Sequence, residues 1–425
     1  HNVYENNYDV IAVVLIDDIE QAGQDAVNLE LGAFSVSDGT VRGSVKLNSQ
    51  TILGNTRYYA DMLVYGNEND KITFKLYDHG TRQELQFNDV NTCILTEAND
   101  ATGNPILGSY IKPVEVNFIT EPYVAQIGDK NYTSLEKAIA AAQAGDVVKV
   151  FAGTYPLPSM KAGITIEGAV DENGEVKVLF EGTLTGTLED LTLKNIHIRG
   201  GNAQRWAYAK GDLTFVNVIF EATSVYALHF DGITEGTNLR DEDCTIIGWA
   251  AMGGTPESCK FIRCTIKDNG TYGVIRTYFD TTIEECTFDV DGANPDDNFQ
   301  DGIHAVDGAY VIVNGCTNVN GTMKDIVNIH AMSVVSIDGV EIKHLAKIGD
   351  NYYFTLAEAF TAAQNGETIK VLHNIALTEG VTVAAGKTVV LDLNGKTISR
   401  NTEAQSSTAA ITNNGNLTIK DEVGG

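Results

Sequence analysis

The sequence contains few basic residues. Of its 425 residues, only 29 are Lys or Arg, against 57 Asp or Glu, which gives a formal net charge of −28 at pH 7. This imbalance argues against a nucleic acid or an anionic membrane as the partner, because both bind to clustered positive charge. The sequence also has no run of 18 apolar residues, so no membrane-spanning helix is predicted.

Proline is scarce as well, with 7 Pro against 41 Gly, and only 20% of the residues are charged while 43% are hydrophobic. This composition is typical of a globular protein and excludes a largely disordered one. A chain of this length is expected to divide into two or three domains. Its last residues resemble a strand without a terminal cap, so we expect the natural chain to continue beyond Gly425.

Residues 1–119 consist of short runs that alternate apolar and polar side chains between Gly, Asn and Asp. Val10 to Val14, Tyr59 to Tyr65 and Lys71 to Tyr77 are such runs, and this spacing predicts an antiparallel β-sandwich. The segments around Leu31 to Phe34 and Ile72 to Asp78 resemble a small sandwich module of exported Bacteroidota surface proteins. That resemblance implies an extracellular or cell-surface location and no particular activity.

An internal repeat follows the predicted sandwich. Ile127-Gly128-Asp129 recurs as Ile348-Gly349-Asp350, an offset of 221 residues (348 minus 127). In each copy an amphipathic, Ala-rich helix comes next, starting near Leu135 and Leu356. Thr355 and Glu358 form a capping-box pattern at the start of the second helix. Because each helix is short and apolar on one face, it is expected to cover an open hydrophobic end.

Between the two copies the sequence repeats with a period close to that of a β-helix coil. The repeated segments begin at Asn195, Asn217, Cys244, Cys264, Cys286 and Cys316, so the steps between them are 22, 27, 20, 22 and 30 residues. Stacked coils place equivalent residues about 4.8 Å apart in ladders. The helix and the coils together resemble the capped right-handed parallel β-helix of the pectin-lyase-like superfamily. About seven coils are expected from Tyr155 to Ile342.

We therefore predict an all-β chain with three parts. Residues 1–119 form the β-sandwich, residues 120–342 form a right-handed parallel β-helix with a cap helix, and residues 343–425 start a second, truncated β-helix with its own cap. Cys244, Cys264, Cys286 and Cys316 follow the coil period, which favours an inward stack of reduced thiols over disulfides. Cys93 and Cys259 lie off this ladder. No CxxC or His-rich spacing supports a zinc site.

The longest coil carries a dense group of oxygen-bearing side chains, which are Asp289, Asp291, Asn294, Asp296, Asp297 and Asp301. Ca²⁺ takes six to eight such ligands, so this loop is a candidate calcium site and the only cofactor site that the sequence suggests. The segment lacks the bidentate Glu of a complete calcium loop. A solvated acidic loop explains the same residues in a chain this acidic.

A row of outward side chains is the main candidate for a functional site. If Leu228, Ile275, Ile303 and Ile329 point inward, the residue after each of them points outward. The predicted outward row is His229, Met252, Arg276, His304 and His330. Trp249, Tyr226, Tyr272 and Tyr278 lie nearby in the sequence, and the aromatic faces of Trp249 and Tyr272 are expected to stack on sugar rings.

The resemblance to pectin-lyase-like enzymes implies a substrate groove along this row. In a lyase of that type, Arg276 would neutralise a uronate carboxylate and abstract a proton, with His304 as a second acid or base. A hydrolase would instead need two carboxylates, and Asp231 and Asp301 are the pair to consider. The sequence carries no diagnostic lyase or polygalacturonase motif.

Three functions fit these residues. We expect recognition of an extracellular or host-surface glycan, or adhesion to it, through His229, Trp249, Tyr272, Arg276, His304 and His330. The first alternative is a polysaccharide lyase or hydrolase acting on an acidic glycan. The second is a structural stalk or a self-assembling surface layer or fibre, because repeated caps fit a longer array.

Overall fold

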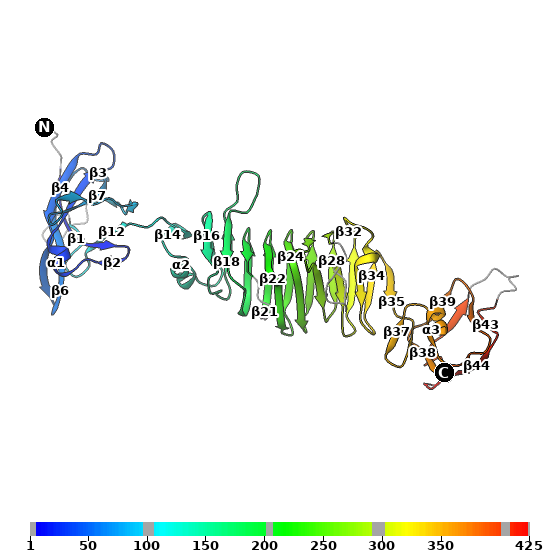
Figure 1. Ribbon diagram of the computed structural model, residues 1–425. Helices are drawn as coiled ribbons and strands as arrows, with labels where there is room; N and C mark the ends of the chain where they lie inside the picture. The colour runs from blue at the N-terminus through cyan, green and yellow to red at the C-terminus, as the bar shows by residue number, and fades with distance from the viewer. Residues whose placement is uncertain (1–5, 97–105, 201–206, 291–301, 401–408, 424–425) are drawn as a thin grey trace. The chain divides into compact units, whose positions relative to one another are not determined.

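The computed structural model describes residues 6–96, 106–200, 207–290, 302–400 and 409–423. In these residues the fold is all-β, with three short α-helices and one 3₁₀ turn. The chain forms two compact units, of which the first contains His1–Val124 and Asn131–Ser134 and the second contains Ala125–Lys130 and Leu135–Gly425. Figure 1 shows the sandwich in blue and the stacked coils in green.

The first unit is a sandwich of two sheets. One sheet has the order β5 (Asn48–Ile52), β6 (Asn55–Gly66), β1 (Asn6–Ile16), β12 (Val114–Ile119), β9 (Asp89–Val90), with β2 (Ile19–Glu20) and β11 (Ile106–Leu107) beside β1. The other has the order β10 (Cys93–Ile94), β7 (Lys71–Asp78), β3 (Leu29–Ser35), β4 (Val41–Lys46), with β8 (Gln83–Glu84) beside β7 and the short α1 (Gly23–Val27) before β3. Most pairs are antiparallel as predicted, but β12 runs parallel to β1.

Alternation along these strands builds the sandwich core. In β1, Tyr8, Val10 and Ala12 are buried and belong to one cluster with Leu31 of β3 and Phe74 of β7. Side chains on the same face of a strand recur every second residue, so these positions all face the opposite sheet.

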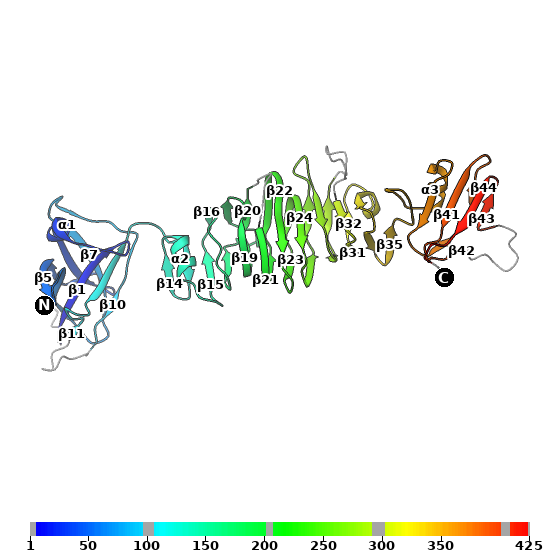
Figure 2. The same cartoon turned by 90° about the horizontal axis from the view of Figure 1, so that it is seen from below.

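The second unit contains a right-handed β-helix of about 10 turns, which Figure 2 shows as a row of stacked coils. The first column of parallel strands is β15 (Val147–Val150), β17 (Thr165–Gly168), β19 (Gly186–Lys194), β21 (Ala207–Val216), β23 (Asn238–Glu242), β25 (Ser258–Ile262), β28 (Thr281–Glu284), β31 (Tyr310–Asn314) and β34 (Val334–Ile337). A second column is β16 (Gly153–Pro156), β18 (Val178–Glu181), β20 (His197–Arg199), β22 (Ile219–Ile233), β24 (Thr245–Gly254), β26 (Thr265–Lys267), β29 (Thr287–Asp289) and β32 (Thr317–Asn318).

A third column completes the coils. It consists of the first residues of β19 and β21 and the second halves of β22 and β24, then β27 (Val274–Thr277), β30 (Gly302–Ala305) and β33 (Val327–Ile329), which follows the 3₁₀ turn Met323–Ile326. The hairpin of β34 with β35 (Val340–Lys343) ends the stack. The predicted number of about seven coils was too low, because the coils before Asn195 lack the Asn and Cys signal from which it was counted.

The cysteine ladder is confirmed and its register is corrected. Cys244, Cys264 and Cys286 are each 1% exposed, Cys316 is half-buried, and all six cysteines are free thiols. Burial raises the pKa of the Cys244 and Cys259 thiols, which keeps them protonated and unreactive. Cys259 lies in a different inward column, where it pairs in register with Leu239 of β23.

The corner residues, however, precede the cysteines by one position. Asn195, Asn217, Asp243, Arg263, Glu285 and Gly315 occupy equivalent corners with φ between 50° and 61°. Asn217 pairs with Asn195 through a side-chain hydrogen bond of 2.9 Å from Nδ2 to Oδ1. Asn195 and Asn217 are therefore not equivalent to the cysteines at which the later repeated segments were predicted to begin, because the tight bend needs a left-handed residue directly before the inward one.

Two helices cover the predicted hydrophobic ends. In α2 (Leu135–Ala141), Leu135, Ala138 and Ile139 are buried, and α3 (Leu356–Ala362) buries Leu356, Ala359 and Phe360. The predicted capping box is present, since Thr355 accepts a hydrogen bond from the Glu358 amide and Glu358 accepts one from the Thr355 amide.

The C-terminal end of each cap helix is also bound by a lysine from the chain segment that follows it. Lys161 Nζ donates to the carbonyl of Ala140 at 2.8 Å, and Lys387 Nζ donates to the carbonyl of Phe360 at 2.8 Å. A cation at a helix C-terminus satisfies carbonyls that have no partner within the helix.

The second cap begins a further set of coils. β36 (Ala346–Ile348), β37 (Asn351–Tyr353), β38 (Thr368–Val371), β41 (Thr388–Asp392) and β44 (Asn416–Lys420) form one sheet, in which β38, β41 and β44 are parallel. The pairs β39 (Ile375–Leu377) with β42 (Ile398–Arg400) and β40 (Val381–Val383) with β43 (Ile411–Asn413) complete two stacked layers. The start of a second β-helix is thus confirmed.

Candidate functional site

The third strand column carries the predicted outward row. His229 of β22, Ala251 of β24, Arg276 of β27, His304 of β30 and Asn328 of β33 are partners in register from one coil to the next. The residues before them include Leu228, Ile275 and Ile303, which are at most 2% exposed. Alternation along each strand therefore directs this row away from the solenoid core.

Two predicted members are not in the row. Met252 is fully buried and pairs with Thr277, so it points inward and Ala251 takes its place. His330 lies two residues beyond Asn328, its side chain is 61% exposed, and its Nδ1 is 4.0 Å from Asp307. The register pairs Val327, not Ile329, with Ile303, and this two-residue shift moves His330 past the end of the row.

Aromatic rings from three coils stack beside the row. Tyr226 and Trp249 have ring centroids 5.1 Å apart with planes at 28°, and Trp249 and Tyr272 have centroids 5.6 Å apart with planes at 24°. Trp249 is between them and is only 5% exposed, whereas Tyr226 and Tyr272 are half-buried. The expectation that Trp249 offers a face to a sugar is wrong, because both of its faces are already covered by tyrosines.

The cation of the row lies against this aromatic group. The guanidinium carbon of Arg276 is 5.8 Å from the Trp249 ring centroid and 5.0 Å from that of Tyr278. The His229 ring stacks on the Tyr226 ring, with the two ring centroids 4.3 Å apart. Contacts of a guanidinium with aromatic faces restrict its orientation and are attractive, so Arg276 is held in place before any ligand arrives.

His304 is the neighbour of Arg276 in the next coil and is 6% exposed. Burial lowers its pKa to about 4, and the positive charge of Arg276 acts in the same direction. The imidazole is therefore neutral at pH 7, where one ring nitrogen can accept a proton or a hydrogen bond. A neutral base beside a cation is an arrangement that binds anions and can also move protons.

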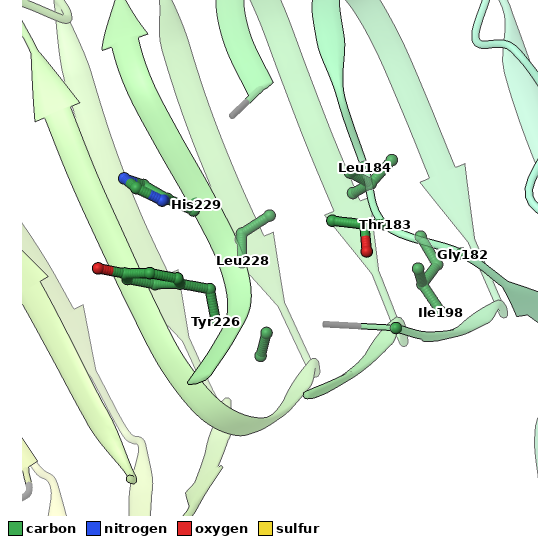
Figure 3. A pocket seen from close by; sticks show the side chains of 9 residues that line it. Gly182, Thr183, Leu184, Ile198, Tyr226, Leu228 and His229 are labelled. Carbon is green, nitrogen blue, oxygen red and sulfur yellow. The ribbon is translucent and has the colours of Figure 1, made fainter. Parts of the chain in front are cut away.

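The hollow at one end of the row is too small for a sugar. It is lined by Tyr226 and His229 on one side and by Gly182, Thr183 and Leu184 on the other, and Figure 3 shows Leu228 directed away from the two ring side chains. Its volume is about 20 Å³, which is room for about one water molecule. A ligand of saccharide size would have to lie along the outer face of the coils.

The acidic candidates are only partly described. Asp231 is exposed on β22, and Asp301, the second carboxylate of the hydrolase pair, lies outside the described residues. Of the calcium candidates, Asp289 is described at the end of β29 with an oxygen 4.0 Å from Lys267 Nζ. Asp291, Asn294, Asp296, Asp297 and Asp301 lie outside the described residues, so the calcium site stays a prediction. The described residues contain no group of three metal-ligating side chains.

Sequence reasoning missed Tyr208 of β21. Its ring is 45% exposed and lies next to Gly232, where an added Cβ would come within 2.9 Å of it. Tyr208 pairs with Gly232 across an irregularity in the register that follows Ala207. No sequence pattern reveals this shift in register, so the sequence did not predict that Tyr208 lies on the same outer face as the row.

No protein-family model, no curated protein and no solved structure matches this chain. The β-helix is therefore established by the coordinates, while the resemblances to the pectin-lyase-like superfamily and to a Bacteroidota module stay expectations. None of the described helices is long and apolar enough to cross a membrane.

Proposed function

We propose that the protein recognises an acidic glycan on the outer face of its β-helix, as an extracellular or cell-surface binding or adhesion protein. The observation that carries this proposal is the placement of Arg276 and His304 in register on adjacent coils, beside half-buried tyrosines. Arg276 and the tyrosines are half-buried on the outer face of the coils, and His304 is buried beside them. The hollow described at this face holds about one water molecule, so a glycan would have to lie along the coils.

Arg276 supplies the charge selection. Its planar guanidinium matches a carboxylate or sulfate with two parallel hydrogen bonds, and its aromatic contacts fix its direction. In a chain of net charge −28, repulsion from the remaining surface disfavours anions elsewhere. Anion binding is thereby concentrated at this cation.

The sugar rings would use the tyrosines that retain exposed surface. Tyr208 is the most exposed of those near the row, and Tyr272 forms the outer end of the stack with Trp249. Trp249 then acts as a support that keeps Tyr272 and Arg276 in position. Adjacent coils are about 4.8 Å apart, so one ligand lying along the solenoid axis can contact several coils.

A lyase is the second candidate, and neutral His304 is the observation that favours it. Arg276 would neutralise a uronate carboxylate and so acidify the proton on the adjacent carbon, and His304 would accept that proton. The electron pair would form a carbon–carbon double bond as the C–O bond to the leaving sugar breaks, and the leaving oxygen would take up a proton.

A glycan array with the whole protein tests both candidates. Because a charge-assisted bidentate contact is worth on the order of 1.5–3 kcal/mol, Arg276→Ala should weaken binding of acidic glycans tenfold or more. Arg199→Ala is the matched control, since Arg199 is an outward arginine on the second column that pairs with Glu181 at 2.6 Å. It should leave binding unchanged.

The array also separates the alternatives. Binding lost equally in both variants would mean diffuse charge attraction and would contradict a site at Arg276. Products with a conjugated double bond, detected by ultraviolet absorbance and abolished by His304→Ala, would assign the lyase. No binding and no turnover on a broad panel would leave a stalk or a self-assembling layer, which light scattering at increasing protein concentration would reveal.

A further inference from the structure

One inward column of the β-helix contains a single carboxylate. Its members, in register from coil to coil, are Val148, Ile166, Leu193, Phe215, Asp241, Phe261, Ile283 and Val313. All of them are at most 1% exposed. Asp241 therefore lies inside the solenoid between two phenylalanines, at a position that every other coil fills with an apolar side chain.

The carboxyl group has no polar partner among the described residues. Both oxygens of Asp241 are buried and neither makes a hydrogen bond, and the residue is 0% exposed. The adjacent Arg240 points to the opposite, outer side of β23, where its Nη2 is 2.8 Å from Glu242. Alternation along the strand thus places the nearest cation of β23 on the wrong side of the sheet to compensate a negative charge at Asp241.

The titratable groups that face Asp241 are thiols. Cys264 Sγ lies 3.4 Å from the main-chain oxygen of Asp241, and Cys244 and Cys259 are the other ionisable side chains that interact with its charge. Burial raises the pKa of the Cys244 and Cys259 thiols and keeps them uncharged, while any negative charge on Cys264 repels a carboxylate at Asp241. These thiols cannot stabilise a carboxylate, and the combined burial raises the pKa of Asp241 well above its usual range.

We propose that Asp241 is held in the core as the neutral acid at physiological pH, so that loss of its proton opens the coil around β23 and makes the β-helix sensitive to alkaline conditions. An uncompensated buried carboxylate is among the most unfavourable groups in a protein interior. The coil can avoid that state only by keeping the proton or by admitting water.

The direction of the pH effect follows from proton binding. The stabilising contribution of the neutral acid is complete below the unfolded pKa, near 3.9, and decreases as pH rises toward the elevated folded pKa. Within that window the folded coil binds one proton more than the open coil. The equilibrium constant for opening should therefore rise up to tenfold per pH unit, and this dependence is opposite in sign to that of a salt-bridged carboxylate.

Thiol labelling of Cys259 in the full chain measures this opening directly. Cys259 is 2% exposed and belongs to the next coil, so a reagent reaches it only when the coils separate. The ratio of the labelling rates of wild type and Asp241→Asn, taken at each pH from 5 to 9, cancels the intrinsic reactivity of the thiol. Asn has nearly the same volume and cannot ionise.

We expect this ratio to rise with pH by up to tenfold per unit and then to level off above the folded pKa. Glu257→Gln removes a charge from the exposed surface just before β25 and should leave the ratio to wild type independent of pH. A ratio for Asp241→Asn that is equally flat would overturn the proposal. Infrared difference spectra of the wild type give a second measurement, because a carboxylate signal in place of a protonated carboxyl signal at Asp241 at pH 7 would also overturn it.

Discussion

The left-handed corners of the β-helix give a quantitative prediction about stability. Glu285 is exposed and has φ of 54°, at a corner where other coils use Asn195, Asn217 or Gly315. Ordinary side chains lose about 1–2 kcal/mol in this conformation because Cβ approaches the following carbonyl oxygen, whereas Asn and Gly tolerate it. Replacing Glu285 by Asn should therefore raise the free energy of unfolding by about 1 kcal/mol.

Removing a suitable corner residue should lower the free energy of unfolding by more than this gain. In Asn217→Ala the corner loses a residue suited to its φ of 51°, and it also loses the 2.9 Å hydrogen bond from Asn217 to Asn195. A net hydrogen bond contributes about 1 kcal/mol, so this variant should lose about 2 kcal/mol in total. The two variants should therefore bracket the wild type.

Tryptophan fluorescence during thermal unfolding can follow these variants, because Trp249 lies in β24 of the β-helix. A change of about 1 kcal/mol corresponds to a shift in Tm of roughly 2–4 °C for a unit of this size. Glu284→Asn is the control, since Glu284 is the adjacent strand residue in β28 and its φ is not positive. An equal gain in Glu284→Asn and Glu285→Asn would refute the backbone explanation, because it would reflect charge alone.

Two further predictions concern the site and the thiols. Since burial lowers the pKa of His304 to about 4, its contribution to stability should be complete above the unfolded pKa near 6.5 and should be lost as pH falls toward 4. NMR titration of the imidazole should show a neutral ring at pH 6, and a midpoint near 6.5 would contradict its burial. Thiol labelling of the native protein should modify the half-buried Cys93 and Cys316 before Cys244, Cys264 and Cys286. Rapid native modification of Cys264 would be incompatible with the inward ladder.

The architecture was predictable because it depends on local periodicity. Alternating side chains indicated the sandwich strands, the 221-residue offset indicated two capped modules, and Thr355 with Glu358 indicated where α3 begins. The alternation and the capping box lie within a few residues of the structure that they specify, and the offset compares two copies of such a local pattern. The inward position of Cys244, Cys264 and Cys286 followed from the coil period in the same way.

Register between coils was decided only by the tertiary structure. Coils differ in length and contain bulges, so the partner of a residue one coil away cannot be counted from the sequence. For this reason Ala251 replaces Met252 in the outward row, and His330 lies beyond it. Likewise, each corner residue precedes the inward residue of its coil by one position, so the Asn corners are not equivalent to the cysteines.

The environment of each side chain was likewise set by the stack. The outward position of Trp249 on its strand predicts an exposed ring. In the structure Tyr226 and Tyr272 from the neighbouring coils cover both of its faces. In the sequence Asp241 lies between Arg240 and Glu242, which predicts a surface position. In the structure, alternation and register place it in the core, between Phe215 and Phe261 of the neighbouring coils. The sequence alone determined which strands and caps form, because that information is local. The burial and charge state of the chemically active groups depend on residues that are 20 or more positions away and meet only when the coils stack.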